Sequence, residues 1–172
     1  TTWTAENCRY PVRKTQENRD DRTRPANIII TCTDNTRSRQ ELWRFLKKYR
    51  ETSVNNERAV YYWMDFGNAQ TTGQVFIGTV RNKIRQPASK EFMPVPEMNV
   101  ITEEVNYSTI EEKDSGASCS LAEALERQDL YINSILAQVG CDILWRMFKE
   151  GRTLYRGAYI NLDTLRVNPI PV

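Results

Sequence analysis

The stretch "NIIITCTDNTRSRQELWRFL" (residues 27–46) decides the fold class. An apolar run over 27–33 is interrupted at Asp34 and Asn35, and the residues that follow repeat with helical spacing. This pattern predicts a buried parallel strand that leads directly into a helix over 36–50, with the aspartate or the asparagine as its cap. Open α/β sheets bind ligands at such strand ends, although no glycine-rich phosphate loop precedes this strand.

The composition indicates one globular domain of nearly balanced charge. The chain has 172 residues, with 24 Lys and Arg against 22 Asp and Glu, so its charge favours neither a nucleic-acid nor a membrane partner. No apolar run reaches the ~20 residues of a membrane span, and no secretion signal is visible. The four cysteines form no CxxC pair, which argues against structural zinc and favours reduced thiols in the cytoplasm. The chain has no histidine, which excludes a Ser-His-Asp or Cys-His mechanism from this chain alone.

Two further strands follow the first helix. β-branched and aromatic residues predict strands over 58–66 and 73–80, with a turn at Gly67-Asn68. Glycines on both sides of this polar turn are typical of a hairpin, and they also occur where a backbone approaches a ligand. The hairpin is the simpler interpretation.

The C-terminal third predicts a long helical stretch that begins at "SCSLAEAL" and that Asp129 can divide into two helices, followed by a second hairpin. Gly151 is a candidate C-cap for the helix, and the hairpin has strands at 155–162 and 165–168, ended by Pro169. The apolar stripe of the helix consists of Ile132, Ile135, Leu136, Val139, Ile143 and Met147.

Residues 82–118 carry no regular pattern, because prolines and then acidic residues interrupt it. A long stretch without structure inside a compact domain is either a functional loop or a disordered insertion. The chain therefore divides into a strand-helix-strand-pair part (1–81), this loop, and a part with helices and a hairpin (119–172). The element order predicts an α/β domain with a mixed sheet.

Two residues are candidates for chemistry. Asp34, at a strand end beside a helix N-terminus, can hold Mg²⁺ and so position the phosphates of a nucleotide, or it can simply cap the helix. Cys119 follows the long loop at the start of a helix, where the helix dipole stabilises a thiolate without a histidine. A small buried residue at a helix start is the competing interpretation.

Other side chains have simpler interpretations. Arg37 and Arg39 can contact phosphate or acidic groups, but both positions are typical of solvated helix residues. Cys32 and Cys141 lie within apolar patterns and are expected to be core thiols.

These features resemble, in their order along the chain, the ThiF/MoeB family, which shares its nucleotide-binding fold with ubiquitin-activating enzymes. "CTDN" followed by Arg39 matches the strand-end motif of the family. The segments "DFGNAQTTGQV", "SCSLAEAL" and "LRVNPIPV" are most similar to the branch of the family encoded in the bacterial PRTRC gene cassette. The resemblance covers essentially the whole chain.

The resemblance implies a Rossmann-like, doubly wound α/β fold of which this chain is the C-terminal portion, with a mixed sheet and a C-terminal hairpin. In this family the N-terminal half carries the glycine-rich loop. The resemblance therefore implies that the phosphate cradle belongs to polypeptide before Thr1 or to a second chain, and that the protein is a homodimer or associates with that half.

The resemblance also implies an activity. The reaction would be ATP-dependent adenylation of the C-terminal carboxylate of a ubiquitin-like or sulfur-carrier protein. Asp34, Asn35 and Arg39 would bind the nucleotide, Asp34 would hold its Mg²⁺, and Cys119 would take the acyl group. Residues 82–118 would form the crossover loop that guides the tail of the carrier.

The chain departs from the family pattern in two respects. The zinc-binding CxxC pairs of many members are absent, and Trp43 occupies the position of a family asparagine. Two hypotheses follow from the sequence: part of an adenylyltransferase, or a non-catalytic dimerisation or docking module that keeps the fold.

Overall fold

The structure, a computed structural model, describes a defined part of the chain. Described are residues 27–33, 35–52 (48–52 as backbone only), 60–81, 84, 86, 88–91, 93, 95, 97–107 and 129–172. The helices and strands are β1 (Ile28–Cys32), α1 (Thr36–Thr52), β2 (Tyr62–Asn68), β3 (Thr72–Thr79), α2 (Ile101–Glu104), α4 (Ile132–Glu150), β4 (Tyr155–Asn161) and β5 (Arg166–Pro171).

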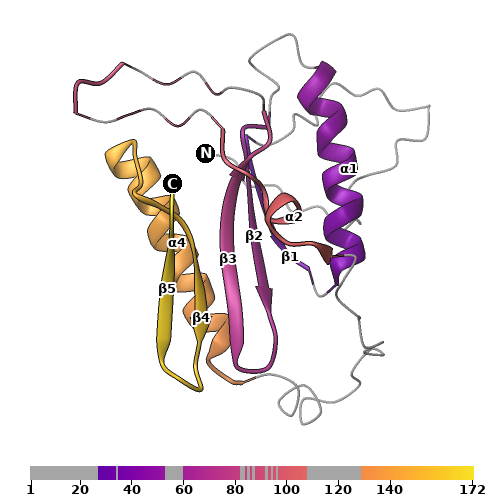
Figure 1. The fold of residues 1–172 in the computed structure, drawn as a ribbon, viewed down its shortest axis with the longest axis vertical. Coiled ribbons are helices and arrows are strands. Elements are labelled where there is room, and N and C mark those ends of the chain that lie inside the picture. Colours follow the sequence, from indigo (N-terminus) through magenta and orange to yellow (C-terminus); the bar gives the residue numbers. More distant parts are fainter. Residues whose placement is uncertain are drawn as a thin grey trace, which may run out of the picture.

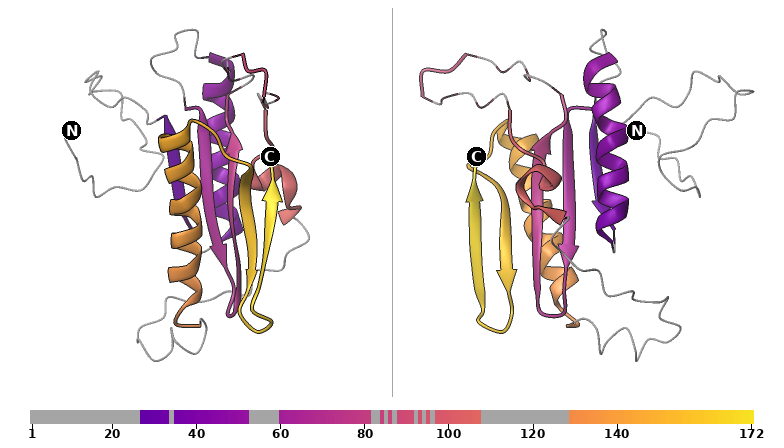
Figure 2. Two further views of the ribbon diagram at one scale, coloured as in Figure 1. Left: turned by 90° about the vertical axis from the view of Figure 1, so that its left-hand side faces the viewer. Right: turned by 45° about the vertical axis from the view of Figure 1, so that its right-hand side comes forward.

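The described strands form one sheet with helices on both faces. The strand order is β1-β2-β3-β4-β5, in which β1 and β2 are parallel and every later pair is antiparallel. Helices α1 and α2 lie on one face and α4 lies on the other (Figures 1 and 2). This confirms the α/β class and the mixed sheet.

Alternating apolar residues in the central strands create a core on each face of the sheet. Trp63 and Phe76 point to the α1 side, where they pack with Leu42 and Leu46 of α1 and with residues near α2. The opposite face is covered by α4, because Met64, Val75 and Ile77 pack against Ile143. The central strands are thus buried on both sides, and their apolar burial stabilises the fold.

The first strand is present where the sequence predicts it, but its predicted burial is wrong. Ile28 and Ile29 are only partly buried, and Ile30 is 52% exposed. Among the described residues β1 lies at an edge of the sheet, and α4 packs on β2, β3 and β4 instead. Ile30, which is aligned with Met64 on the α4 side of the sheet, therefore stays exposed in the described part of the chain.

The first hairpin is confirmed, but its turn lies at residues 69–72 and not at the predicted Gly67-Asn68. Gly67 and Asn68 belong to β2, and the turn is closed by a hydrogen bond from Ala69 N to Thr72 O of 2.8 Å. A Cβ at Gly67 would lie 2.9 Å from Nη2 of Arg39. This glycine therefore allows an arginine to approach the strand and does not form a turn.

The stretch predicted to lack regular structure contains the short helix α2. Val100 and Ile101 are buried against the sheet. The backbone before them approaches Gly78 so closely that a Cβ there would lie 2.5 Å from the Asn99 carbonyl oxygen. A pair of apolar residues without periodicity gives no helix signal, so only long-range packing reveals this element. Residues 108–118 lie outside the described part.

The C-terminal elements follow the sequence closely. Helix α4 buries the predicted stripe, and Gly151 ends it with a positive φ of 67°. The predicted end of the last strand at Pro169 is wrong, since β5 continues to Pro171. Within the described sheet β5 is an edge strand, and an edge strand tolerates residues without an N–H group.

Tyr107 carries a buried hydroxyl that contacts no hydrogen-bonding partner among the described residues. Burial raises the pKa of Tyr107 to about 12, with Arg39 opposing the rise and Asp65 and Tyr159 adding to it. We expect Tyr107→Phe to increase the free energy of unfolding by about 1 kcal/mol at neutral pH, because it removes an unpaired polar group.

The pH dependence of unfolding provides a second measurement on Tyr107. Between pH 10 and 12 the unfolded chain loses the phenolic proton while the folded chain keeps it, so this residue lowers stability as the pH rises. Urea unfolding of Tyr107→Phe should therefore show a weaker loss of stability above pH 10 than the parent. An equal loss in both proteins would contradict the prediction.

Candidate functional site

The candidate site lies at the carboxyl ends of the parallel strands β1 and β2. Helix α1 begins there, and the Asn35 side chain caps it by accepting a hydrogen bond of 2.7 Å from Ser38 N. The sequence predicts Asp34 or Asn35 as the cap, and the structure confirms the asparagine. Asp34 itself lies outside the described residues.

Arg39 connects the two strand ends from the first turns of α1. Its Nε donates to Asp65 Oδ2 at 2.7 Å, and its Nη2 donates to the carbonyl oxygens of Thr33 and Phe66 at 2.7 and 2.8 Å. Thr33 follows β1 and Phe66 belongs to β2. One guanidinium thus holds both carbonyls and a carboxylate in fixed positions.

The carboxylate of Asp65 is part of a longer hydrogen-bonded chain. Trp63 Nε1 donates to Thr31 Oγ1 at 2.7 Å, and the Thr31 hydroxyl donates to Asp65 Oδ1 at 2.6 Å. Asp65 is fully buried, and this burial raises the pKa of its carboxyl, while Arg39 and Thr31 lower it less than burial raises it. Both oxygens of the buried carboxylate are therefore paired.

The hydroxyl of Thr33 differs from the rest of this network. Its Oγ1 is buried and contacts no hydrogen-bonding partner in the described part of the chain. Thr33 lies between the end of β1 and the start of α1. A buried hydroxyl without a partner costs free energy unless a bound group satisfies it.

The structure brings two of the predicted site residues together and leaves the others undescribed. Asn35 and Arg39 both act at the start of α1, whereas Cys119, like Asp34, lies outside the described residues. The interpretation of Arg39 as a solvated residue is wrong, because it is only 6% exposed. Arg37 is solvated as predicted, and its Nε lies 3.0 Å from Glu41 Oε1.

The two described cysteines are not core residues. Cys32 and Cys141 are both exposed, which corrects the expectation drawn from their apolar neighbours. Cys32 ends a strand at the edge of the described sheet, and Cys141 lies on α4. Partial burial and the nearby Asp65 raise the pKa of the Cys32 thiol, and Arg39 lowers it less. The net rise favours the unreactive thiol over the thiolate.

Asp65 is the residue that the sequence interpretation missed. It is a single acid within the β-rich run "VYYWMDFG", and a buried carboxylate requires a cationic partner. Arg39 shares helical spacing with the buried residues Leu42, Trp43 and Leu46. These two signals together could have predicted the ion pair.

The site holds two strand-end carbonyl groups and a carboxylate in place, but its described residues do not form a complete cofactor site. No group of three or more Cys, Asp or Glu side chains in the described part could hold a metal ion. Asn35 and Arg39 already bind protein groups. The start of α1 offers N–H groups, which favour an anion.

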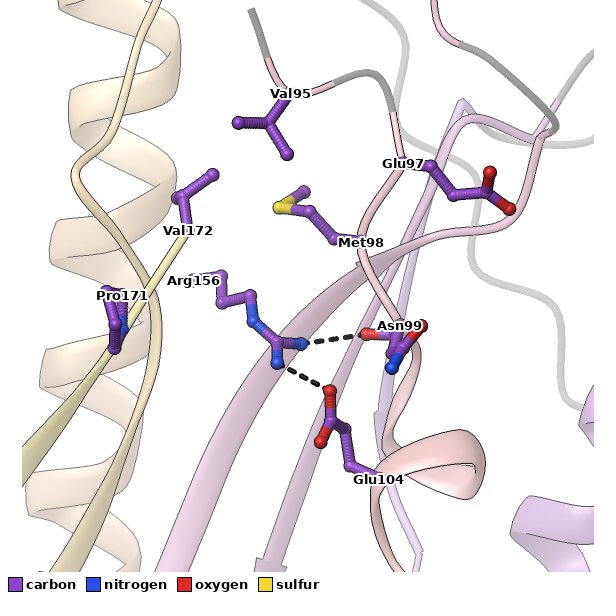
Figure 3. Close-up of a pocket in the computed structure, with 8 residues that line it drawn as sticks. All are labelled: Val95, Glu97, Met98, Asn99, Glu104, Arg156, Pro171 and Val172. Atoms are coloured by element: carbon purple, nitrogen blue, oxygen red, sulfur yellow. Dashed lines mark hydrogen bonds and ion pairs between the residues drawn. The ribbon is translucent and has the colours of Figure 1, made fainter. Parts of the chain in front are cut away.

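A separate hollow of about 260 Å³ is lined by residues of the segment 95–99, of α2, of β4 and of the C-terminal end. Figure 3 shows Arg156 at its centre, where it donates to the Asn99 carbonyl oxygen at 2.9 Å and to Glu104 at 2.6 Å. Glu97 and apolar residues such as Val95 and Pro171 complete its lining. Its cation is already neutralised by Glu104, so the strand-end site is the stronger candidate.

Comparison with known proteins adds no family assignment. No protein-family model matches the chain, and no curated protein matches it. Within the described residues, no helix is long and apolar enough to cross a membrane.

Proposed function

We propose that this chain contributes the strand-end part of an ATP-dependent adenylyltransferase that activates a ubiquitin-like or sulfur-carrier protein. The observation that supports the proposal is the buried hydroxyl of Thr33, a residue of the "CTDN" segment, which has no hydrogen-bonding partner among the described residues. Because that segment resembles the ThiF/MoeB motif, a nucleotide is the group that we expect to form a hydrogen bond with this hydroxyl. The α/β fold with a parallel β1–β2 pair agrees with such a site.

The proposal assigns roles to few residues of this chain. Asp34 would hold the magnesium ion of the nucleotide, and Thr33 and the start of α1 would contact phosphate oxygens. Arg39 would keep the two strand ends in place for these contacts, and Cys119 would take the acyl group from the adenylate. The described residues do not form a complete site for MgATP, so the remaining contacts would come from other residues or a second polypeptide.

ATP–pyrophosphate exchange tests this proposal. The assay uses the natural full-length protein with small ubiquitin-like proteins encoded beside its gene. We expect carrier-dependent exchange that falls on the order of a hundredfold in Asp34→Ala and about tenfold in Thr33→Val. The matched control Asp142→Ala, which changes an exposed aspartate of α4, should leave exchange unchanged.

Thr33→Val separates a functional role from a structural one. Because its hydroxyl has no described partner, the variant should unfold at the same or a higher urea concentration than the parent. Exchange that falls while stability is kept supports contact with the substrate. Absence of exchange in the parent, or equal exchange in parent and Asp34→Ala, would reject the enzymatic proposal.

A non-catalytic docking module is the second candidate, and Arg39 favours it. The motif arginine is buried, and its described bonds go to protein groups. Trp43, which replaces a family asparagine, is a buried core residue stacked on Trp63. Both observations agree with a chain that keeps the family scaffold for assembly alone, and the exchange assay separates the two candidates.

A further inference from the structure

Residues 97–107 cross the α1 side of the sheet as one segment, which we call the strap. The strap contains α2, which contacts β3 (Figures 1 and 2). It lies beside β3 where β4 no longer pairs, because that pairing ends at Phe76. There Thr79 N donates to the Met98 carbonyl oxygen at 2.9 Å, and Met98 N donates to the Thr79 hydroxyl at 2.8 Å. Hydrogen bonds to a single residue thus fasten this end of the strap to β3.

Arg156 fastens the middle of the strap to β4. It lies where the register of β4 with β5 shifts, and its guanidinium donates to the Asn99 carbonyl oxygen and to the Glu104 carboxylate (Figure 3). The same guanidinium lies 4.7 Å from the centroid of the Phe76 ring. The side chains of Arg156 and Glu104 are 13% and 29% exposed, so solvent reaches this ion pair, and solvent weakens such pairs.

The strap also contains two hydroxyl groups that its present position leaves without hydrogen bonds. Thr102 Oγ1 and the Tyr107 hydroxyl are buried, and neither contacts a hydrogen-bonding partner among the described residues. Of the three such side-chain atoms in the described part of the chain, two belong to the strap. Both groups would bind water in an open segment, so their burial opposes closure of the strap.

We infer that residues 97–107 open as a unit while the strands below stay paired, and that the Arg156–Glu104 ion pair is the latch. Closure is favoured by the burial of Val100 and Ile101 in the α1-side core. It is opposed by the two unpaired hydroxyls. Segments with few stabilising contacts open locally with a smaller free energy than the whole domain. The inference does not depend on adenylyltransferase activity.

Opening of the strap would change access to the strand-end network. Tyr107 lies close enough to Arg39 and Asp65 for their charges to affect its pKa, and it packs in the same core cluster as Trp63. With the strap closed, Arg39 and Asp65 are almost fully buried. An open strap would uncover this side of the core, so water and ligands could reach the ion pair that holds the two strand ends.

Hydrogen exchange at two neighbouring amides separates strap opening from global unfolding. Thr79 N donates to Met98 of the strap, whereas Val80 N donates to the Tyr61 carbonyl oxygen on the β2 side. In NMR measurements on the full chain, we expect the Thr79 amide to exchange about tenfold or more faster than the Val80 amide. Low concentrations of urea should barely change the Thr79 rate, because local opening exposes little surface, and should raise the Val80 rate steeply.

Two substitutions should move the Thr79 exchange rate in opposite directions. Glu104→Gln weakens the latch and should speed exchange about fivefold. Tyr107→Phe removes an unpaired hydroxyl from the closed strap and should slow exchange about fivefold. The matched control Glu41→Gln changes an exposed ion pair of α1 and should leave the Thr79 rate unchanged.

Several results would overturn the inference. Equal exchange of Thr79 and Val80, or the same steep urea dependence for both, would mean that the strap opens only when the sheet unfolds. An unchanged Thr79 rate in Glu104→Gln would mean that the ion pair is no latch. Circular dichroism first checks that each variant is folded. If Tyr107→Phe does not fold, Thr102→Val removes the other unpaired hydroxyl, and an unchanged or faster Thr79 rate there would contradict the opposing role of these groups.

Discussion

Arg39→Met is expected to lower the free energy of unfolding by about 3–5 kcal/mol, because it leaves the buried Asp65 carboxylate without its cationic partner. The two groups are 6% and 0% exposed, and their atoms are 2.7 Å apart. The substitution also removes the donors to the Thr33 and Phe66 carbonyls. Urea unfolding followed by circular dichroism measures the loss.

Two controls separate the effect of breaking the buried Arg39–Asp65 pair from the effect of replacing any arginine of α1. Arg37→Met removes an exposed pair with Glu41 and should change stability by less than about 1 kcal/mol. The double variant Arg39→Met/Asp65→Leu should recover part of the loss, since a buried pair can be replaced by apolar groups. A loss in Arg39→Met no larger than that in Arg37→Met would contradict the assigned geometry.

The pH dependence of the Arg39→Met variant has a definite sign. Burial already raises the pKa of Asp65, and removal of the guanidinium raises it further. A carboxyl with a raised pKa in the folded state favours folding at low pH and loses that contribution as the pH rises. The loss of stability in Arg39→Met should therefore be smaller near pH 4 than at pH 7.

Trp63→Ala is expected to cost about 3–5 kcal/mol, which is the range for truncation of a large buried aromatic. Trp63 is 1% exposed and stacks on Trp43 with ring centroids 6.1 Å apart. Its Nε1 also donates a hydrogen bond to the Thr31 hydroxyl. This is the first bond of the network that continues through Asp65 to Arg39. The substitution thus leaves a cavity in the α1-side core and breaks the first bond of the network.

Trp145→Ala provides a matched control for this prediction. It is the same chemical change at a residue that is 60% exposed, and it should alter stability by less than about 0.5 kcal/mol. Trp63→Phe keeps most of the ring and should cost an intermediate amount, since the Thr31 hydroxyl loses its donor. Equal effects of the two alanine substitutions in thermal unfolding would contradict the described core.

The sequence predicts the elements whose signals are local. Helix α1 and the buried stripe of α4 follow from repeated apolar spacing, and Gly151 follows from the preference for glycine at a positive φ. The β2–β3 and β4–β5 hairpins follow from β-branched and aromatic runs between turn residues. These signals lie within a few residues of one another along the chain.

The remaining features depend on contacts between distant residues. The Arg39–Asp65 pair joins positions 26 residues apart, and short α2 forms because Val100 and Ile101 pack on the sheet. Gly67 has the appearance of a turn residue, yet it provides space for Arg39. The exposure of β1 also depends on where α4 lies, which no pattern within β1 indicates.

The position of Arg39 affects how mutational data on this protein are interpreted. The same guanidinium holds the two strand ends and part of the buried network, so a substitution there changes the population of native molecules before it changes any chemistry. Reduced cellular function in such a variant would reflect a lower protein level as readily as a damaged site. Thr33 and Asp34 are therefore better positions for genetic tests, whereas Arg39 variants are informative only when the amount of native protein is measured.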